Sequence, residues 1–500
     1  MATNALVWLA ARKVWTGRGG CPVRRLPTPE TARMVWPPSS TAPMAPGTPA
    51  ATSVSSSRWK SAGPVTGGTG AGWAAADRAD AGNIVHIGQT ARPDQASVRY
   101  RSSMRPPSER LELPDAWGTS RASRLFPGCW LAHADLHNHT WLSDGAGDPR
   151  LAFGSMRAAG LDVAALTDHS RWASAFLDMA KAPGWTGIDP RAWRQTIALA
   201  AAANADGEFV ALHGFEWSHA AYGHMNVWNS GGFTDPLRTA PTMNRFWRWL
   251  ETRGDDGLAG FNHPGTGRLR FGAFGYRPAM AQRLISLELF NKLEDYLLKD
   301  TDRGKQSPLN QCLNAGWRVG LLGVTDEHGP DWGQPEGKGR AGLWVAELTR
   351  AGVLEALAAR RFFASRVKGL RLDVALTSLA GGGAGERARM GTAVAHPGGP
   401  VRVEVDLSRG EAWEGRRLGV QVLRPGERLP TLAAAVEAAL PGPSEPVLSL
   451  ELDLDPADGD WVVLRVTDPS EPPDPRATGE WAGQGRAIAY ASPFWLQPPA

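Results

Sequence analysis

Histidines and carboxylates recur at the ends of short apolar runs in the middle of the chain, which holds most of its 11 histidines. In the run HADLHNHT, His137 and His139 are separated by one residue. On an extended strand both imidazoles then point to the same face and can share a metal ion. Asp144, in the SDG turn that follows, is either a turn former or a hard oxygen ligand one short loop away. The run VTDEHG repeats the same-face arrangement with Asp326 and His328.

Four further motifs end in ligand types. Glu216 follows the apolar run FVALHGF, where a carboxylate needs a partner, and a metal ion would provide one. In TDHS, we expect His169 to be the ligand and Asp168 to support it, although a helix N-cap is a close alternative for Asp168. His224 in GHMN and His263 in NHPG are each either metal ligands or histidines satisfied within the core.

These candidate ligands can share a metal ion only if the strands that carry them end at the same edge of a sheet. From about residue 125 the sequence alternates short apolar runs with helical stretches such as DPRLAFGSMRAAG and PRAWRQTIALAAAANADG, which is typical of an α/β fold. In a closed α/β barrel the carboxyl ends of the strands form the active-site face. His213 and His219, which flank Glu216, are predicted to be packing or rim histidines.

The chain divides into three segments by its composition and its pattern of apolar residues. Residues 1–124 are rich in Pro, Ser, Thr, Gly and Ala and are predicted to be a low-complexity, disordered extension, or in part an upstream addition to a protein that begins near Met104. Residues 125–368 are predicted to form the α/β barrel. Residues 369–500 alternate apolar and polar residues and predict an antiparallel β-sandwich, interrupted by a helix-like insert, LPTLAAAVEAAL.

Composition excludes several classes of protein. The 54 Lys and Arg residues against 50 Asp and Glu give a net charge of +4, which does not call for a nucleic-acid partner. Three cysteines are too few for a disulfide framework or a Cys-type zinc site. Because no apolar run is long enough to span a bilayer and the N-terminus does not resemble a secretory signal, we expect a cytoplasmic protein without a membrane partner.

The series DLHNHTWLSDG, GLDVAALTDH, GFEW, GHMN, NHP and TDEH resembles, in this order, the PHP (polymerase and histidinol phosphatase) family of metal-dependent hydrolases. The runs LAARRFFAS and AYASPFWL resemble its carbaryl-hydrolase-like CehA/McbA branch, in which a β-domain follows the barrel. The resemblance implies a distorted seven-stranded (βα)7 TIM-like barrel with up to three divalent ions. It implies nine metal ligands, at His137, His139, Asp144, His169, Glu216, His224, His263, Asp326 and His328. Thr325 stands where the family often has serine, and Asp144 where other branches use histidine, which leaves the metal open.

Two or three ions of zinc, manganese or iron suit this mixture of imidazoles and carboxylates. They would lower the pKa of a bridging water, so the chain is predicted to be a metal-dependent hydrolase of a small-molecule ester. Glu216 would bridge ions, and Asp326 or His328 would orient the hydroxide or assist the leaving group.

Cations in two loops could hold an anionic ester, which favours a phosphoesterase. These substrate-binding candidates are Arg268, Arg270, Lys338 and Arg340, and solvated loop charges are their alternative. Hydrolysis of a carboxylic or carbamate ester is the second hypothesis, because the same hydroxide attacks a carbonyl. The third is an inactive barrel whose β-domain binds a partner or a carbohydrate.

Overall fold

The computed structural model describes residues 118–170, 187–265, 269–333, 337–380 and 385–499. Its α-helices are α2 (Pro149–Ala158), α4 (Pro190–Ala203), α5 (Met243–Arg253), α6 (Pro308–Asn314) and α7 (Arg350–Ala358). The strands of the first part are β1 (Trp130–Asp135), β2 (Val163–Leu166), β3 (Val210–His219), β4 (Gly223–Trp228), β5 (Leu258–Phe261), β6 (Leu284–Asn291), β7 (Glu294–Asp295), β8 (Gly320–Val324), β9 (Arg340–Val345) and β10 (Phe362–Ser365). The strands of the C-terminal part are β11 (Arg371–Ser378), β12 (Ala388–Arg389), β13 (Ala393–Ala395), β14 (Gly399–Ser408), β15 (Arg417–Arg424), β16 (Thr431–Ala439), β17 (Leu448–Leu454), β18 (Trp461–Asp468), β19 (Arg486–Ala491) and β20 (Phe494–Gln497).

The first part is a mixed α/β structure. β1, β2 and β3 are parallel, as are β5, β6 and β8, whereas β4 is antiparallel to both of its neighbours β3 and β5. The isolated bridge between Asn138 and Glu327 joins the carboxyl ends of β1 and β8. The apolar runs predicted to be strands are strands, and both quoted helices form, each begun by an Asp side chain that caps it and a Pro in its first turn.

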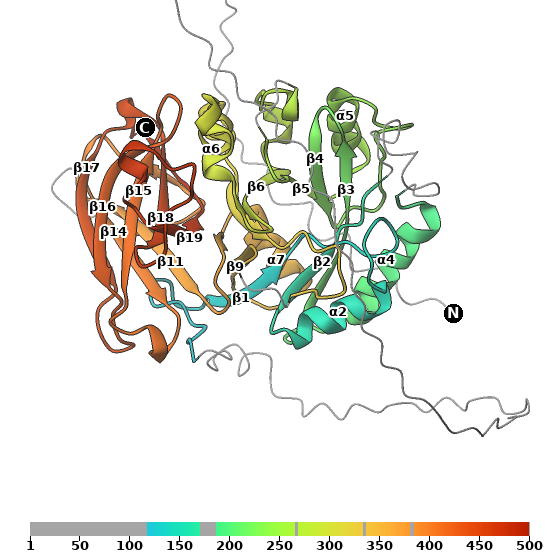
Figure 1. The fold of residues 1–500 in the computed structure, drawn as a ribbon, viewed down its shortest axis with the longest axis horizontal. Coiled ribbons are helices and arrows are strands. Elements are labelled where there is room, and N and C mark those ends of the chain that lie inside the picture. Colours follow the sequence, from blue (N-terminus) through green and yellow to red (C-terminus); the bar gives the residue numbers. More distant parts are fainter. Residues whose placement is uncertain (1–117, 171–186, 266–268, 334–336, 381–384, 500) are drawn as a thin grey trace, which may run out of the picture. The chain divides into compact units, whose positions relative to one another are not determined.

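Helices cover the parallel strands. Figure 1 shows α2 and α4 running beside β2 and β3. The apolar face of α2, with Phe153 and Met156, packs with Leu166 of β2 and Phe209 in one buried cluster. This packing fixes the strands, so the loops at their carboxyl ends are held in place.

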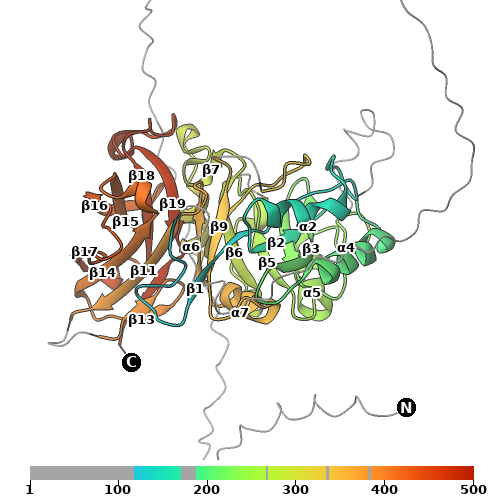
Figure 2. The same cartoon turned by 90° about the horizontal axis from the view of Figure 1, so that it is seen from below.

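The C-terminal part is built from two β-sheets. β12, β11, β14 and β17 form one antiparallel sheet, and β16, β15, β18 and β19 run antiparallel in the other, whose edge also holds one parallel pair, β13 with β20. Alternate residues such as Val374 and Val403 from the first sheet, and Val420 and Leu464 from the second, share one buried core. Figure 2 shows these strands from a second direction.

The predicted boundary at residue 368 does not separate two independent sheets. β10 pairs with β19, so strands of both parts belong to one 16-stranded sheet. Phe290 of β6 and Tyr490 of β19 lie in the same buried cluster, with ring centres 5.1 Å apart. The first part therefore packs against the C-terminal part near β6.

Two segments of the chain differ from the sequence prediction. Residues 118–124, predicted to be disordered, are hydrogen bonded: Ser123 Oγ donates to Asp373 (2.6 Å) and Arg121 pairs with Asp162 (2.5 Å). The rest of the predicted extension, 1–117, lies outside the described residues. The helix-like insert is the strand β16, which pairs with β15 along its whole length. Alanine is the best helix former, but intrinsic propensity is worth less than about 1 kcal/mol per residue and tertiary context often overrides it. Here the hydrogen bonds offered by β15, together with Leu432 and Ala434 packing on the cores, outweigh that preference.

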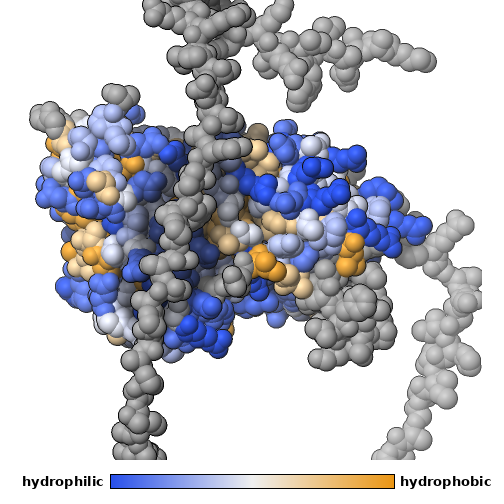
Figure 3. Space-filling view, turned by 90° about the horizontal axis from the view of Figure 1, so that it is seen from above, coloured by the Kyte–Doolittle hydropathy of each residue, from blue (hydrophilic) through white to orange (hydrophobic). Residues whose placement is uncertain are grey.

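Among the described residues no helix is both long and apolar enough to cross a bilayer. Figure 3 shows one face of the molecule, where hydrophilic residues predominate and apolar ones form small separate areas.

Candidate metal centre

Imidazoles and carboxylates from the ends of several strands converge at one place. His137 and His139 follow β1, and the amide of His139 donates to Glu327 O (2.8 Å) beyond the end of β8. This pairing brings the two same-face motifs of the sequence together. His137 Nε2 and His139 Nε2 are 3.1 Å apart, and both lie near Asp326 Oδ1, at 3.6 and 3.2 Å.

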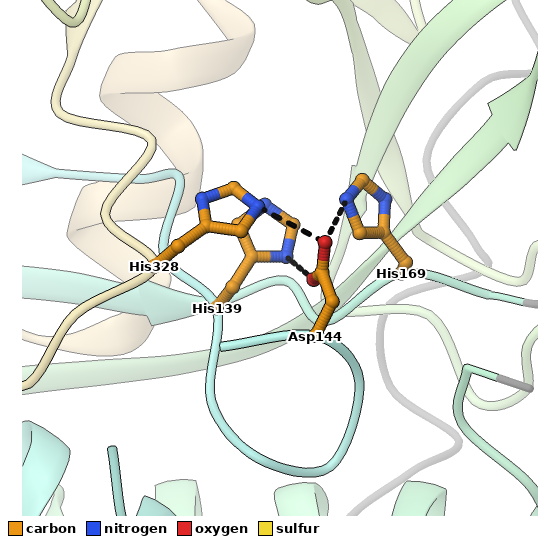
Figure 4. Close-up of side chains that lie close together, drawn as sticks. All are labelled: His139, Asp144, His169 and His328. Carbon is orange, nitrogen blue, oxygen red and sulfur yellow. Dashed lines mark ion pairs between the residues drawn. The ribbon is translucent and has the colours of Figure 1, made fainter. Parts of the chain in front are cut away.

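Asp144 is the centre of the first group of ligand types. Figure 4 shows its carboxylate pointing between the imidazoles of His139, His169 and His328. The distances are 3.9 Å to His139 Nδ1, 3.6 Å to His169 Nε2 and 3.4 Å to His328 Nε2. The ring centres of His139 and His328 are only 4.1 Å apart. The four side chains offer atoms within 4.8 Å of one another, which is close enough to hold a metal ion.

Glu216 is the centre of two further groups. Its carboxylate is fully buried and lies close to five imidazoles from four motifs. Oε1 lies near His137, His224 and His263, at 3.4, 3.3 and 3.2 Å. Oε2 lies 2.6 Å from His169 Nδ1 and 3.7 Å from His139 Nε2. The carboxylate therefore joins the side of the cluster that holds His137 to the side that holds His169, as an ion-bridging ligand would.

The electrostatics of the cluster follow from this crowding. Burial opposes ionisation of Glu216, but the imidazoles of His169, His224 and His137 outweigh it and hold its pKa well below its ordinary value. Burial and the neighbouring His169 lower the pKa of His139 to about 3. An ionised carboxylate and a neutral imidazole are the forms that bind a metal ion.

The donor set fits a divalent cation. His139 Nδ1 is buried and has no hydrogen-bond partner in the described part of the chain, which is costly for a polar atom. A metal ion coordinated by His139 and Asp144 would supply the missing partner. Two of the ligand positions, His263 and Asp326, adopt left-handed backbone angles, with φ of 28° and 49°. Such angles in residues other than glycine are frequent at functional sites.

Buried acids outside the nine positions orient the ligands. Asp168 accepts hydrogen bonds from Thr140 N (2.7 Å) and Ser143 Oγ (2.7 Å), and so holds the loop that carries Asp144. Burial raises the pKa of Asp168 to about 6, against the effect of these hydrogen bonds.

Sequence reasoning missed Glu288. This carboxylate on β6 contacts His137 Nδ1 (2.8 Å) and accepts from the amide of His263 (2.6 Å) and from Asn291 (2.9 Å). It therefore fixes two ligand positions at once. The signal was available, because Glu288 interrupts the apolar run RLISLELFN as Glu216 interrupts its own run.

The remaining sequence candidates are placed differently. His213 and His219 lie outside the cluster: His213 Nε2 contacts Ser230 O (3.0 Å), and His219 Nδ1 accepts from the amide of Ala221 (3.1 Å). Their interpretation as packing or rim residues agrees with these contacts.

Three of the four predicted substrate-binding cations lie among the described residues, in different settings. Lys338 forms an ion pair with Glu327. Arg340 was expected in a loop but is the first residue of β9 and is only 5% exposed, because β9 pairs with β1 beneath the cluster. Arg270 begins a 3-10 turn, Arg270–Gly272, and Arg268 lies outside the described residues.

Comparisons with known proteins add little. No model of a known protein family matches the chain, and no curated protein matches it. A solved two-domain protein from Bacteroides vulgatus, described as containing a predicted PHP-like metal-dependent phosphoesterase, is 16% identical, covers 75% of this chain and 100% of its own, and gives a TM-score of 0.37. An amidohydrolase from Chromobacterium violaceum is 14% identical, covers 47% of this chain and 98% of its own, and gives a TM-score of 0.22. At these values the likenesses assign neither family nor activity to this chain.

Proposed function

We propose that the chain is a metal-dependent hydrolase that cleaves phosphoesters, a PHP-type enzyme of the CehA/McbA branch with a distorted seven-stranded barrel. The observation that carries the proposal is the convergence of six imidazoles on the carboxylates of Glu216, Asp144 and Asp326. The barrel would consist of β1 to β6 and β8, closed by the bridge between Asn138 and Glu327.

The nine ligand positions would hold two or three divalent ions of zinc, manganese or iron, which activate a water molecule and neutralise charge on an ester. The three overlapping groups of ligand types support more than one ion. Glu216 would be shared between neighbouring ions, since its two oxygens face different imidazoles.

Asp326 or His328 would orient the hydroxide or assist the leaving group. His328 Nδ1 lies 3.4 Å from Asp326 Oδ1, while its Nε2 lies 3.4 Å from Asp144. Burial opposes a charged imidazole, but these two carboxylates raise the pKa of His328. His328 would donate a proton to a leaving oxygen only in a state in which it does not coordinate an ion, because a metal ion binds the neutral imidazole. It is also about 30% exposed, so a substrate can reach it.

The test combines metal analysis of the full chain with turnover of phosphomonoesters, phosphodiesters and aryl carboxylic or carbamate esters. We expect bound transition metal, loss of turnover on chelation, and faster turnover of a phosphoester than of any carbonyl ester. Asp326→Asn should lose metal and activity, and His219→Ala should lose neither. Metal-free protein that turns over normally would refute the metal-dependent reaction, and hydrolysis of carbonyl esters alone would replace the phosphoesterase with the second hypothesis.

A further inference from the structure

Two of the cations predicted to hold an anionic substrate are otherwise engaged or buried. Lys338 is paired with Glu327, and Arg340 is buried as the first residue of β9. A buried guanidinium at the start of β9 is poorly placed to meet a substrate from solvent. An anionic ester therefore needs a cation other than these two.

Lys292 brings an ammonium group to the cluster. Its Nζ lies 3.3 Å from Asp326 Oδ2, and its side chain is 50% exposed. His139 and His137 approach the other oxygen of the same carboxylate, Oδ1. Lys292 therefore faces the ligand cluster across Asp326 while half of its side-chain surface stays open to solvent.

The backbone holds Lys292 in this place. Asn291 of β6 pairs with Glu294 of β7, which leaves Lys292 and Leu293 as a two-residue turn. Lys292 has a φ of 53°, the left-handed angle that tight two-residue hairpin turns require. Its carbonyl accepts a hydrogen bond from Gly339 N (3.2 Å).

Three side chains distant in the sequence, two of them from the C-terminal part, hold this turn in place. Arg366 Nη2 donates to Leu293 O (3.0 Å), and Arg476 Nη2 donates to Asp295 O (3.0 Å). The hydroxyl of Tyr490 on β19 donates to Asp295 Oδ2 (2.9 Å). Three side chains more than 70 residues away in the sequence thus fix the two strands that present Lys292.

We propose that Lys292 binds an anionic phosphoryl oxygen of the substrate, and that Arg476 and Tyr490 of the C-terminal part position the turn that carries it. The inference rests on the proposed phosphoesterase function and names the residue that recognises the substrate's charge. A lysine ammonium is a compact, mobile point charge and a common phosphate ligand. Its distance from Asp326 lets one ammonium contact both that carboxylate and an oxyanion bound at the cluster.

A purely structural role for Lys292 makes a different prediction. If the ammonium only neutralises Asp326, its loss should lower metal content or the melting temperature and leave the affinity for phosphate unchanged. If it binds the substrate, its loss should weaken phosphate binding while metal content stays constant.

The first experiment measures binding of inorganic phosphate to the manganese-loaded full chain by titration calorimetry, with metal content and melting temperature determined for each variant. Lys292→Met keeps the length of the side chain and removes the charge, so we expect the phosphate Kd to rise at least about tenfold, as for loss of one charge-assisted hydrogen bond. Lys292→Arg should recover most of the affinity. Lys305→Ala, a matched exposed lysine nearby, should bind phosphate like the unaltered chain. In turnover assays Lys292→Met should raise KM more than it lowers kcat.

The second experiment tests whether the contacts of the C-terminal part with Asp295 position the turn that carries Lys292. Tyr490→Phe keeps the ring packed on Phe290 and removes the hydrogen bond to Asp295, and Arg476→Gln removes the other contact independently. Each should raise the phosphate Kd about threefold or more at unchanged metal content. Arg402→Gln, which breaks the exposed pair with Glu451 in the same part, should have no effect.

The outcomes separate the two proposals. Unchanged phosphate binding by Lys292→Met would overturn the role of Lys292 and leave the phosphoesterase proposal standing. An unaltered, metal-loaded chain that neither binds phosphate nor cleaves phosphoesters would overturn the phosphoesterase proposal, and the inference with it. Normal binding by both Tyr490→Phe and Arg476→Gln would overturn the positioning role of the C-terminal part.

Discussion

Replacement of Glu216 by glutamine tests the centre of the cluster most directly. The substitution keeps the size of the side chain and removes a charge that lies 2.6 to 3.7 Å from five imidazoles. Loss of a group that only orients a ligand costs about 10- to 100-fold in metal affinity. A carboxylate in contact with so many ligand positions should cost at least about 100-fold, and turnover should fall by a similar factor.

The same loss of about 100-fold in metal affinity can be measured as a change in the free energy of unfolding. A cation present at about 1,000 times its Kd stabilises the folded chain by about 4.1 kcal/mol, and a 100-fold weaker Kd reduces this to about 1.4 kcal/mol. Glu216→Gln should therefore lose about 2.7 kcal/mol of the stabilisation that added metal provides. The assay compares unfolding in denaturant with and without manganese, alongside metal content after dialysis. His219→Ala, three residues along the same strand, is the matched control. A Glu216→Gln protein that keeps its full metal content and turns over within about threefold of the unaltered chain would refute the bridging role.

Three further outcomes are expected. Glu288→Gln should weaken metal binding about 10- to 100-fold, because it loses the charge that orients His137, and metal analysis after dialysis would expose a normal affinity. Chelation should lower the melting temperature of the unaltered chain, and an unchanged melting curve would argue against a bound ion. Gly147→Ala would place a methyl group 2.1 Å from the ring of Trp332 and should destabilise the fold by about 1–3 kcal/mol, which denaturant unfolding measures; equal stability would show that the Trp332 ring moves aside.

The order of strands and helices in the first part was predictable because its elements carry local signals. Apolar runs of four to eight residues become buried strands, and Asp-Pro pairs mark the starts of α2 and α4. The strand β16 was not predictable in this way, since its alanines carry a local preference that only pairing with β15 overrides. The pairing of β10 with β19 joins residues more than 120 positions apart, and nothing in either segment specifies its partner.

The candidate ligands were predictable for a related reason. Most lie just after the carboxyl end of a strand, whereas Glu216 lies within β3 and His224 lies near the start of the antiparallel β4. The chemistry and the position of most candidates are therefore found in the same short motif, and parallel strands bring such ends together. Lys292 has no comparable motif: its role depends on a turn held by Arg366, Arg476 and Tyr490. Lys338 and Arg340, by contrast, look like loop cations in the sequence and are an ion-paired residue and a buried strand residue in the fold. A ligand type near a strand end thus predicts a candidate metal site from local sequence, whereas the position of Lys292, the proposed substrate-binding residue, depends on tertiary contacts that include those of Arg476 and Tyr490 in the C-terminal part.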